Sequence, residues 1–239
     1  MRDTLQNFTL PAAVKAFLGT QLSIATPAGY LSARYFSWII ALPIVYAVVQ
    51  GTGAIAGDEG SGTMDLLLAQ PVTRRSVVLQ RTAAACAGVV IMLTGGWLGF
   101  ATSTPFVGID VSLVDTAVAS LNMVPITLFF FALSLWLGAV AANRGMAAGV
   151  ATAAVTAGYF VNSLATGVAA IRNLQYATPF YYYGAGLPLV NGIAWTHVGL
   201  LFGASALLVV LALRSFERRD VSAGGGDVDL RGILRRVFA

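Results

Sequence analysis

Long apolar runs alternate with short polar stretches along this chain of 239 residues. The charged residues gather in the polar stretches, which leaves several runs of about 20 residues without Asp, Glu, Lys or Arg. Because the hydrocarbon core of a bilayer is about 30 Å thick, about 20 apolar helical residues cross it. The pattern therefore predicts an all-α, polytopic transmembrane helical bundle. We expect five spans, at 35–56, 82–104, 117–142, 145–170 and 194–213.

Composition agrees with this pattern and excludes a soluble domain. Hydrophobic residues make up 57% of the chain and charged residues only 10%, with a mean hydropathy of +0.79. Soluble domains carry roughly 25% charged residues. The net charge of +4 is small and concentrated beside the apolar runs, so it indicates membrane orientation rather than a nucleic-acid partner. A single cysteine, Cys86, leaves neither a disulfide framework nor a cysteine-based metal site.

The distribution of basic residues predicts the orientation of the bundle. Cytoplasmic loops of membrane proteins carry an excess of Lys and Arg. Ten of the 14 basic residues would lie on one side: Arg74, Arg75, Arg81, Arg144, Arg214, Arg218, Arg219, Arg231, Arg235 and Arg236. This places the 57–81 loop and the 214–239 tail in the cytoplasm. Segments 1–34 and 171–193 would then be extracellular, the former with an interfacial helix beginning near Pro11.

Five spans with a cytoplasmic C-terminus leave the N-terminus outside the cell. Two explanations stay open at this point. A further span could precede Met1 in a longer form of the chain, which is the explanation we favour. Alternatively, the short N-terminal segment inserts directly with its end outside.

The polar 57–81 loop carries its own helix signals. Gly57 would release the first span, and 58–62 would form an acidic turn. Ser61 or Thr63 would then cap a short helix over 62–69. This helix would place three apolar side chains on one face: Met64, Leu67 and Leu68.

A second helix is predicted to follow directly. Pro71 stops the short helix, and Thr73 can cap a helix that begins at Arg74 and continues through the second span to residue 104. Its first turns would protrude from the membrane, because the helix exceeds the hydrocarbon thickness. Two interpretations of the short helix are open. It could lie against the lipid headgroups, or it could be a docking surface for a cytoplasmic partner.

The residues of this loop resemble a known family. Residues 57–75 read Gly-Asp-Glu-Gly-Ser-Gly-Thr-Met-Asp-Leu-Leu-Leu-Ala-Gln-Pro-Val-Thr-Arg-Arg, which resembles the cytoplasmic loop of ABC-2 type permeases, the membrane subunits of ABC exporters. Two further matches lie at 178–192 and 215–220. The family normally has six spans with both termini in the cytoplasm, so by this resemblance the chain lacks the first span.

The resemblance implies that the loop forms a coupling helix seated in a groove of a separate ATPase subunit. It implies the following docking residues: Asp58, Glu59, Thr63, Met64, Asp65, Leu67, Leu68, Gln70, Arg74 and Arg75. It also implies a pair of short re-entrant helices within 171–193 that close the outer end of the pathway. The residues assigned to this extracellular gate are Phe180, Tyr181, Tyr182 and Tyr183. An aromatic belt at the outer interface explains the same residues without a gate.

No catalytic chemistry is evident in the chain. There is no Gly-x-x-x-x-Gly-Lys-Ser/Thr phosphate loop, and the expected spans hold no Asp, Glu, Lys or Arg for a coupling ion. Any ATP and Mg would be bound by the partner ATPase, and we expect no cofactor, metal or enzyme activity in this chain. His197 and Ser205 lie more than two helical turns apart, which makes a catalytic dyad implausible.

These observations lead to one preferred function and two alternatives. The preferred function is that of a permease subunit of an ATP-driven exporter, pairing with a second permease, most simply itself, and with two ATPase subunits. It would work by alternating access in a prokaryotic plasma membrane, and the substrate is left open. The alternatives are a non-transporting membrane anchor or regulatory subunit and, less favoured, an ion-coupled secondary transporter.

Overall fold

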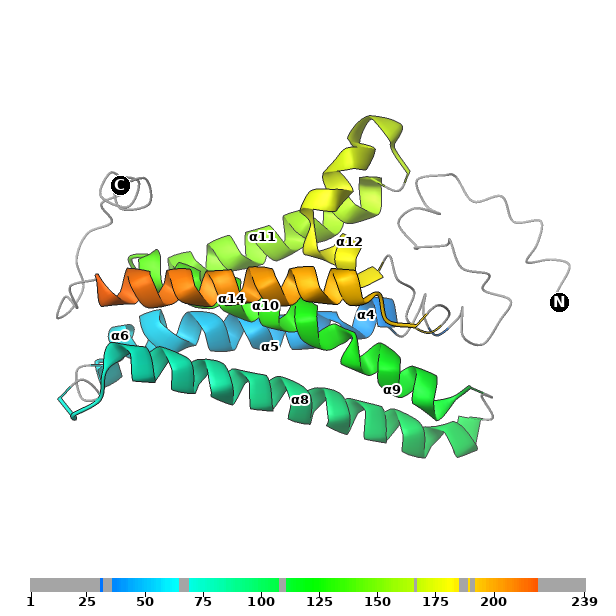
Figure 1. Ribbon diagram of the computed structural model, residues 1–239, viewed down its shortest axis with the longest axis horizontal. Helices are drawn as coiled ribbons and strands as arrows, with labels where there is room; N and C mark the ends of the chain where they lie inside the picture. The colour runs from blue at the N-terminus through cyan, green and yellow to red at the C-terminus, as the bar shows by residue number, and fades with distance from the viewer. Residues whose placement is uncertain are drawn as a thin grey trace, which may run out of the picture.

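The computed structural model describes residues 31, 36–64, 69–107, 111–165, 167–184, 189 and 192–218. In this part of the chain the structure is helical throughout, without strands (Figure 1). The elements are α4 (Ser37–Ile39), α5 (Ala41–Thr52), the π-helix η2 (Gly53–Gly57), α6 (Asp58–Gly60), α8 (Arg74–Val107), α9 (Leu113–Leu121), α10 (Met123–Val140), α11 (Arg144–Ala165), the 3-10 helix η3 (Ala169–Ala177), α12 (Pro179–Gly184) and α14 (Trp195–Glu217).

Four helical stretches are long and apolar enough to cross a membrane. They are Arg74–Phe106, Leu113–Val140, Arg144–Ala165 and Trp195–Glu217. The all-α polytopic architecture is thereby confirmed. The expected first span at 35–56 falls on α4, α5 and η2, which a turn at Ile40 and the π-helix divide into shorter pieces. The total of five spans stays a prediction.

Helix α10 forms the centre of the bundle, between α5 and α14 (Figure 1). A helix that is apolar all round is buried on every side, and α10 fits that description. Its side chains Ile126, Phe130, Phe131 and Leu135 are almost wholly buried. The core therefore follows one central helix.

Small residues let α5 approach α10 closely. A Cβ added at Gly51 would lie 2.6 Å from Ser134 Cβ and 2.7 Å from the carbonyl oxygen of Phe131. On the other side of the contact, a Cβ added at Gly138 would be 3.6 Å from Thr52 Cα. Membrane helices use small residues in this way to bring their backbones together.

The first helical stretch continues beyond Gly57, where we expected it to end. It passes through η2 into α6, and the amide of Ser61 still donates to the Gly57 carbonyl over 3.1 Å. Because the backbone hydrogen bonds are kept, a glycine alone does not stop the helix. The left-handed residue that follows the helix is Gly62, with φ of 73°. The acidic turn expected at 58–62 is therefore mostly helical.

Helix α8 begins where the sequence predicted. The hydroxyl of Thr73 accepts a hydrogen bond from the amide of Ser76 over 3.2 Å and so caps the helix. The helix runs for 34 residues, slightly beyond the expected end at 104. At 1.5 Å per residue this is about 51 Å, longer than the hydrocarbon core is thick.

The remaining expectations fall partly outside the described residues. Of the 1–34 segment, only Leu31 is described, so its interfacial helix lies outside. The short helix expected at 62–69 is described at its two ends only, and residues 219–239 of the tail lie outside as well. Two short helices, η3 and α12, lie at 169–184, and the re-entrant character expected for 171–193 stays a prediction.

Candidate functional site

Polar side chains from three elements meet at one end of the bundle. Figure 1 places α6, the beginning of α8 and the end of α14 at this end, although α14 lies far from the other two in sequence. The 57–81 loop therefore lies beside the end of the last helix. We call this region the polar end.

Arg74 joins the loop to the last helix through two contacts. Its Nη1 donates a hydrogen bond of 2.9 Å to the carbonyl oxygen of Phe216, and its guanidinium lies 5.2 Å from the centre of the Phe216 ring. A cation at the C-terminal end of a helix also interacts favourably with the helix dipole. Because the Phe216 side chain is fully buried, these contacts attach Arg74 to the core of the bundle.

Two ion pairs add to this connection. Arg75 pairs with Glu217 on α14, and Arg81 pairs with Asp58 on α6. Exposed pairs of this kind contribute little to stability, because solvent screens the attraction between the charges. They link the beginning of α8 to both of its neighbours, and together with the Arg74 contacts they form what we call the loop clamp.

The residues that the resemblance implied as docking residues lie in different environments. Thr63 and Gln70 are exposed, and Asp58 and Glu59 are half-buried. Met64 is fully buried within the core of this chain. Its side chain anchors the loop, so it does not face a partner in this conformation. Three further predicted residues lie outside the described part of the chain: Asp65, Leu67 and Leu68.

Sequence reasoning missed the two residues of α14 that complete the loop clamp. Residues 215–220 stood out as part of a resemblance, but nothing there assigned Phe216 and Glu217 as partners of the loop arginines. An available signal was the charge of Glu217, an acidic residue directly after the last apolar run. Only the fold shows that it meets Arg75.

The four aromatic residues of the predicted gate lie at the other end of the bundle and divide into two groups. Phe180 is buried, with its ring 5.4 Å from that of Phe130 and 5.6 Å from that of Tyr159. Tyr183 donates a hydrogen bond of 3.1 Å to the carbonyl oxygen of Phe36, and burial raises the pKa of its phenol. These two side chains hold α12 against the bundle.

The other two, Tyr181 and Tyr182, surround the imidazole of His197. Their ring centres lie 5.8 and 5.4 Å from that of His197. The hydroxyl of Tyr182 donates to the carbonyl oxygen of Tyr176 over 2.8 Å. Ser205, on the same helix as His197, donates instead to the carbonyl oxygen of Leu201, so the two do not form a dyad. The gating role of these aromatic residues stays a prediction.

The fold and its two ends define the class of protein. A bundle with four helices long and apolar enough to cross a membrane, and with charges concentrated near the helix ends, is a multi-pass membrane protein. The family model described as ABC-2 family transporter protein matches residues 6–221, and the chain belongs to this family. A search of curated proteins found no match. In the described part of the chain, no group of three His, Cys, Asp or Glu side chains is placed to hold a metal ion.

Proposed function

We propose that this protein is the membrane-spanning permease subunit of an ATP-driven exporter. Its 57–81 loop would receive the movement of a separate ATPase subunit and pass it to the spans. The observation that carries this proposal is the loop clamp, because the same short stretch of α8 is attached to α6 through Arg81 and to α14 through Arg74 and Arg75. A force on the loop would therefore act directly on the two long helices α8 and α14.

The exposed part of the loop is the surface offered to the ATPase. The helix expected over 62–69 would be the docking helix, and its apolar residues Leu67 and Leu68 would enter the ATPase groove. Thr63 and Gln70 are exposed on either side of these two leucines in the sequence. Arg74 and Arg75 border the contact while they hold α14. The ATPase subunits, two for each complex, would bind ATP and Mg. A second copy of this chain would complete the transport pathway.

The arrangement of basic residues supports a cytoplasmic position for the polar end. Among the described residues, Arg74, Arg75, Arg81 and Arg214 belong to elements that meet there, whereas Arg172 lies on η3 at the other end. By the positive-inside rule, the polar end would face the cytoplasm. We propose a prokaryotic plasma membrane as its location. The aromatic cluster around α12 would then close the outer end of the pathway between cycles of alternating access.

Co-purification with the ATPase tests this proposal. The chain is expressed together with the ATPase encoded beside it, in the wild type and with Leu67→Asp and Leu68→Asp combined. We expect the ATPase to co-purify with the wild type and to be lost from the double variant. The matched control is Leu174→Asp, an exposed leucine on η3 at the other end, which should retain the ATPase.

Four results would count against the proposal. Absence of the ATPase from the wild-type preparation would contradict it directly, and so would an intact complex in the double variant. Retention of the complex without ATP-dependent transport by the reconstituted protein would favour the alternative function, a non-transporting membrane anchor. Transport driven by an ion gradient alone would favour a secondary transporter.

A further inference from the structure

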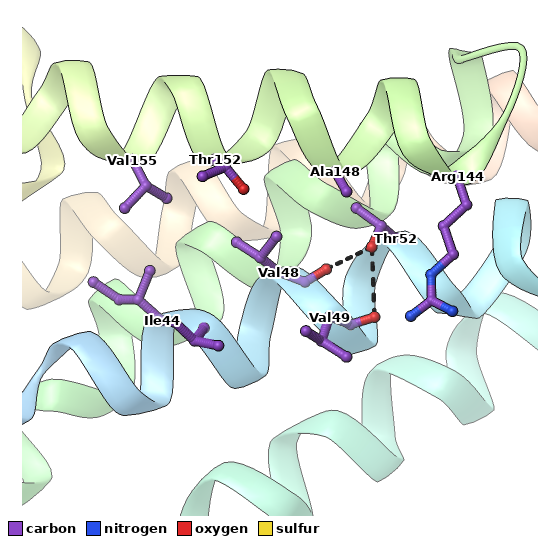
Figure 2. Close-up of a pocket in the computed structure, with 9 residues that line it drawn as sticks. Ile44, Val48, Val49, Thr52, Arg144, Ala148, Thr152 and Val155 are labelled. Carbon is purple, nitrogen blue, oxygen red and sulfur yellow. Dashed lines mark hydrogen bonds between the residues drawn. The ribbon is translucent and has the colours of Figure 1, made fainter.

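A groove on the outside of the bundle lies between α5 and α11 (Figure 2). Its volume is about 240 Å³, and it is open along one side. Figure 2 shows the side chains of Ile44, Val48 and Val49 on one wall and of Ala148 and Val155 on the other. The groove is therefore long, narrow and mostly aliphatic.

The groove stays apolar although a threonine hydroxyl lies in its wall. The hydroxyl of Thr52 donates to the carbonyl oxygen of Val48 over 2.8 Å, so it is satisfied within its own helix. Val45 and Val49 are exposed along the opening. In a membrane protein these walls would face acyl chains rather than water.

Arg144 stands at one end of the groove. Its side chain lies across η2, since a Cβ added at Gly57 would be 3.3 Å from Arg144 Cδ and one added at Gly53 would be 3.5 Å from Nη2. The two glycines thus leave room for the guanidinium beside the helix. Arg144 makes no ion pair with any residue that the structure describes. An apolar groove thus ends at a guanidinium that makes no ion pair with a described residue.

The length of the groove matches one leaflet of a bilayer. Arg144 and Val155 are eleven residues apart on α11, which corresponds to about 16 Å along the helix. Half of the hydrocarbon core is about 15 Å thick. A molecule with its charge at Arg144 could therefore lay one acyl chain along the groove as far as the middle of the membrane.

We propose that this groove binds one anionic phospholipid from the cytoplasmic leaflet. The phosphate would accept hydrogen bonds from the Arg144 guanidinium, and one acyl chain would lie between α5 and α11. Charge-assisted hydrogen bonds of a guanidinium to phosphate are strong and oriented, and an anionic headgroup keeps a net negative charge that a zwitterionic one lacks. The choice of leaflet rests on the proposed function, because it uses the cytoplasmic position of the polar end.

Native mass spectrometry of the purified full chain tests the proposal. The protein in detergent is mixed with phosphatidylglycerol or with phosphatidylcholine of the same acyl chains, and the bound molecules are counted. We expect one retained phosphatidylglycerol, with about tenfold weaker retention of phosphatidylcholine, equivalent to about 1.4 kcal/mol. Arg144→Gln should lower phosphatidylglycerol retention by about the same factor. Arg172→Gln, which removes an exposed arginine at the other end, should leave it unchanged.

Two further arms identify the source of the anion and the use of the groove. Ala148→Trp fills the groove and keeps Arg144, so it should lose both lipids, and its melting temperature checks that it folds. Glycerol phosphate, which has the headgroup chemistry without the acyl chains, should fail to displace phosphatidylglycerol at equal concentration. Displacement at equal concentration would mean a site for free anions and would overturn the proposal.

Other outcomes would also refute binding of an anionic phospholipid in the groove. Equal retention of both lipids, or unchanged retention in Arg144→Gln, would refute the role of Arg144. Disulfide-linked dimers of Val49→Cys would show that a second copy occupies the groove. All of these measurements are made without the ATPase, so their failure is distinguishable from failure of the proposed function.

Discussion

The close crossing of α5 and α10 makes Gly51 a sharp test of the bundle. An added Cβ at Gly51 would lie 2.6 Å from Ser134 Cβ, 2.7 Å from the Phe131 carbonyl oxygen and 2.9 Å from the Leu135 amide nitrogen. Two of these three atoms belong to the backbone of α10. They cannot move aside without shifting the central helix, so Gly51→Ala overpacks the core.

The expected size of the effect follows from two opposing contributions. Overpacking a well-packed core costs about 1–3 kcal/mol. Replacing glycine by alanine within a helix recovers about 0.5–1 kcal/mol. All three contacts of the added Cβ are shorter than 3.0 Å, so we expect a cost in the upper part of this range, about 2–3 kcal/mol. The net destabilisation of Gly51→Ala is then about 1–2.5 kcal/mol. For a chain of this size, this corresponds to a fall in melting temperature of roughly 2–10 °C.

Gly99→Ala on α8 is the matched control. An added Cβ at Gly99 meets nothing within 4 Å, so only the gain in helix preference remains. We expect this variant to be as stable as the wild type or slightly more stable. Unfolding of both variants is followed by tryptophan fluorescence in the same detergent. Equal stability of the two variants would refute the close α5–α10 crossing.

Three further predictions concern the two ends of the bundle. In the complex with the ATPase, Arg74→Gln should keep the ATPase bound but change the rate of ATP hydrolysis. Arg75→Gln should resemble the wild type in both measurements. Loss of ATPase binding in Arg74→Gln would instead make Arg74 a docking residue only. Tyr183→Phe, which removes one hydrogen bond, should lower the free energy of unfolding by about 1 kcal/mol. Phe180→Ala should lower it by about 3–5 kcal/mol, measured in the same unfolding assay, and a loss below 1 kcal/mol would contradict the aromatic packing of α12.

The sequence predicted those features of the fold that depend on neighbouring residues. The start of α8 is one example, since Pro71 and the Thr73 cap are local signals and the helix begins at Arg74. The apolar runs likewise predicted where the long helices lie, because the thickness of the bilayer core sets the number of apolar residues needed to cross it. Helix ends shifted by several residues. Helix α8 continues to Val107 through a polar stretch at 102–104, and α14 continues to Glu217 after its apolar pattern has stopped.

Features that depend on residues far apart in sequence could not be predicted. The sequence predicted that the first helix ends at Gly57, whereas the residue in the left-handed conformation is Gly62. Arg144 lies against Gly57 from more than 80 residues away. Likewise, Arg74 meets Phe216 across 142 residues. Periodicity cannot show which helix will lie beside another.

The contacts of Arg74 and Arg75 in the loop clamp differ in strength, and this difference determines which of them would transmit a movement of the loop to α14. The pair between Arg75 and Glu217 is exposed, so solvent screens it and it is a weak contact. Arg74 donates to a carbonyl oxygen in a partly buried place, where a hydrogen bond to a charged group contributes about 1.5–3 kcal/mol. Since the Phe216 ring beneath Arg74 is buried in the core, displacement of Arg74 strains α14 before it breaks the contact. We therefore expect Arg74 to transmit movement of the loop to the last helix, while Arg75 and Glu217 can separate at little cost.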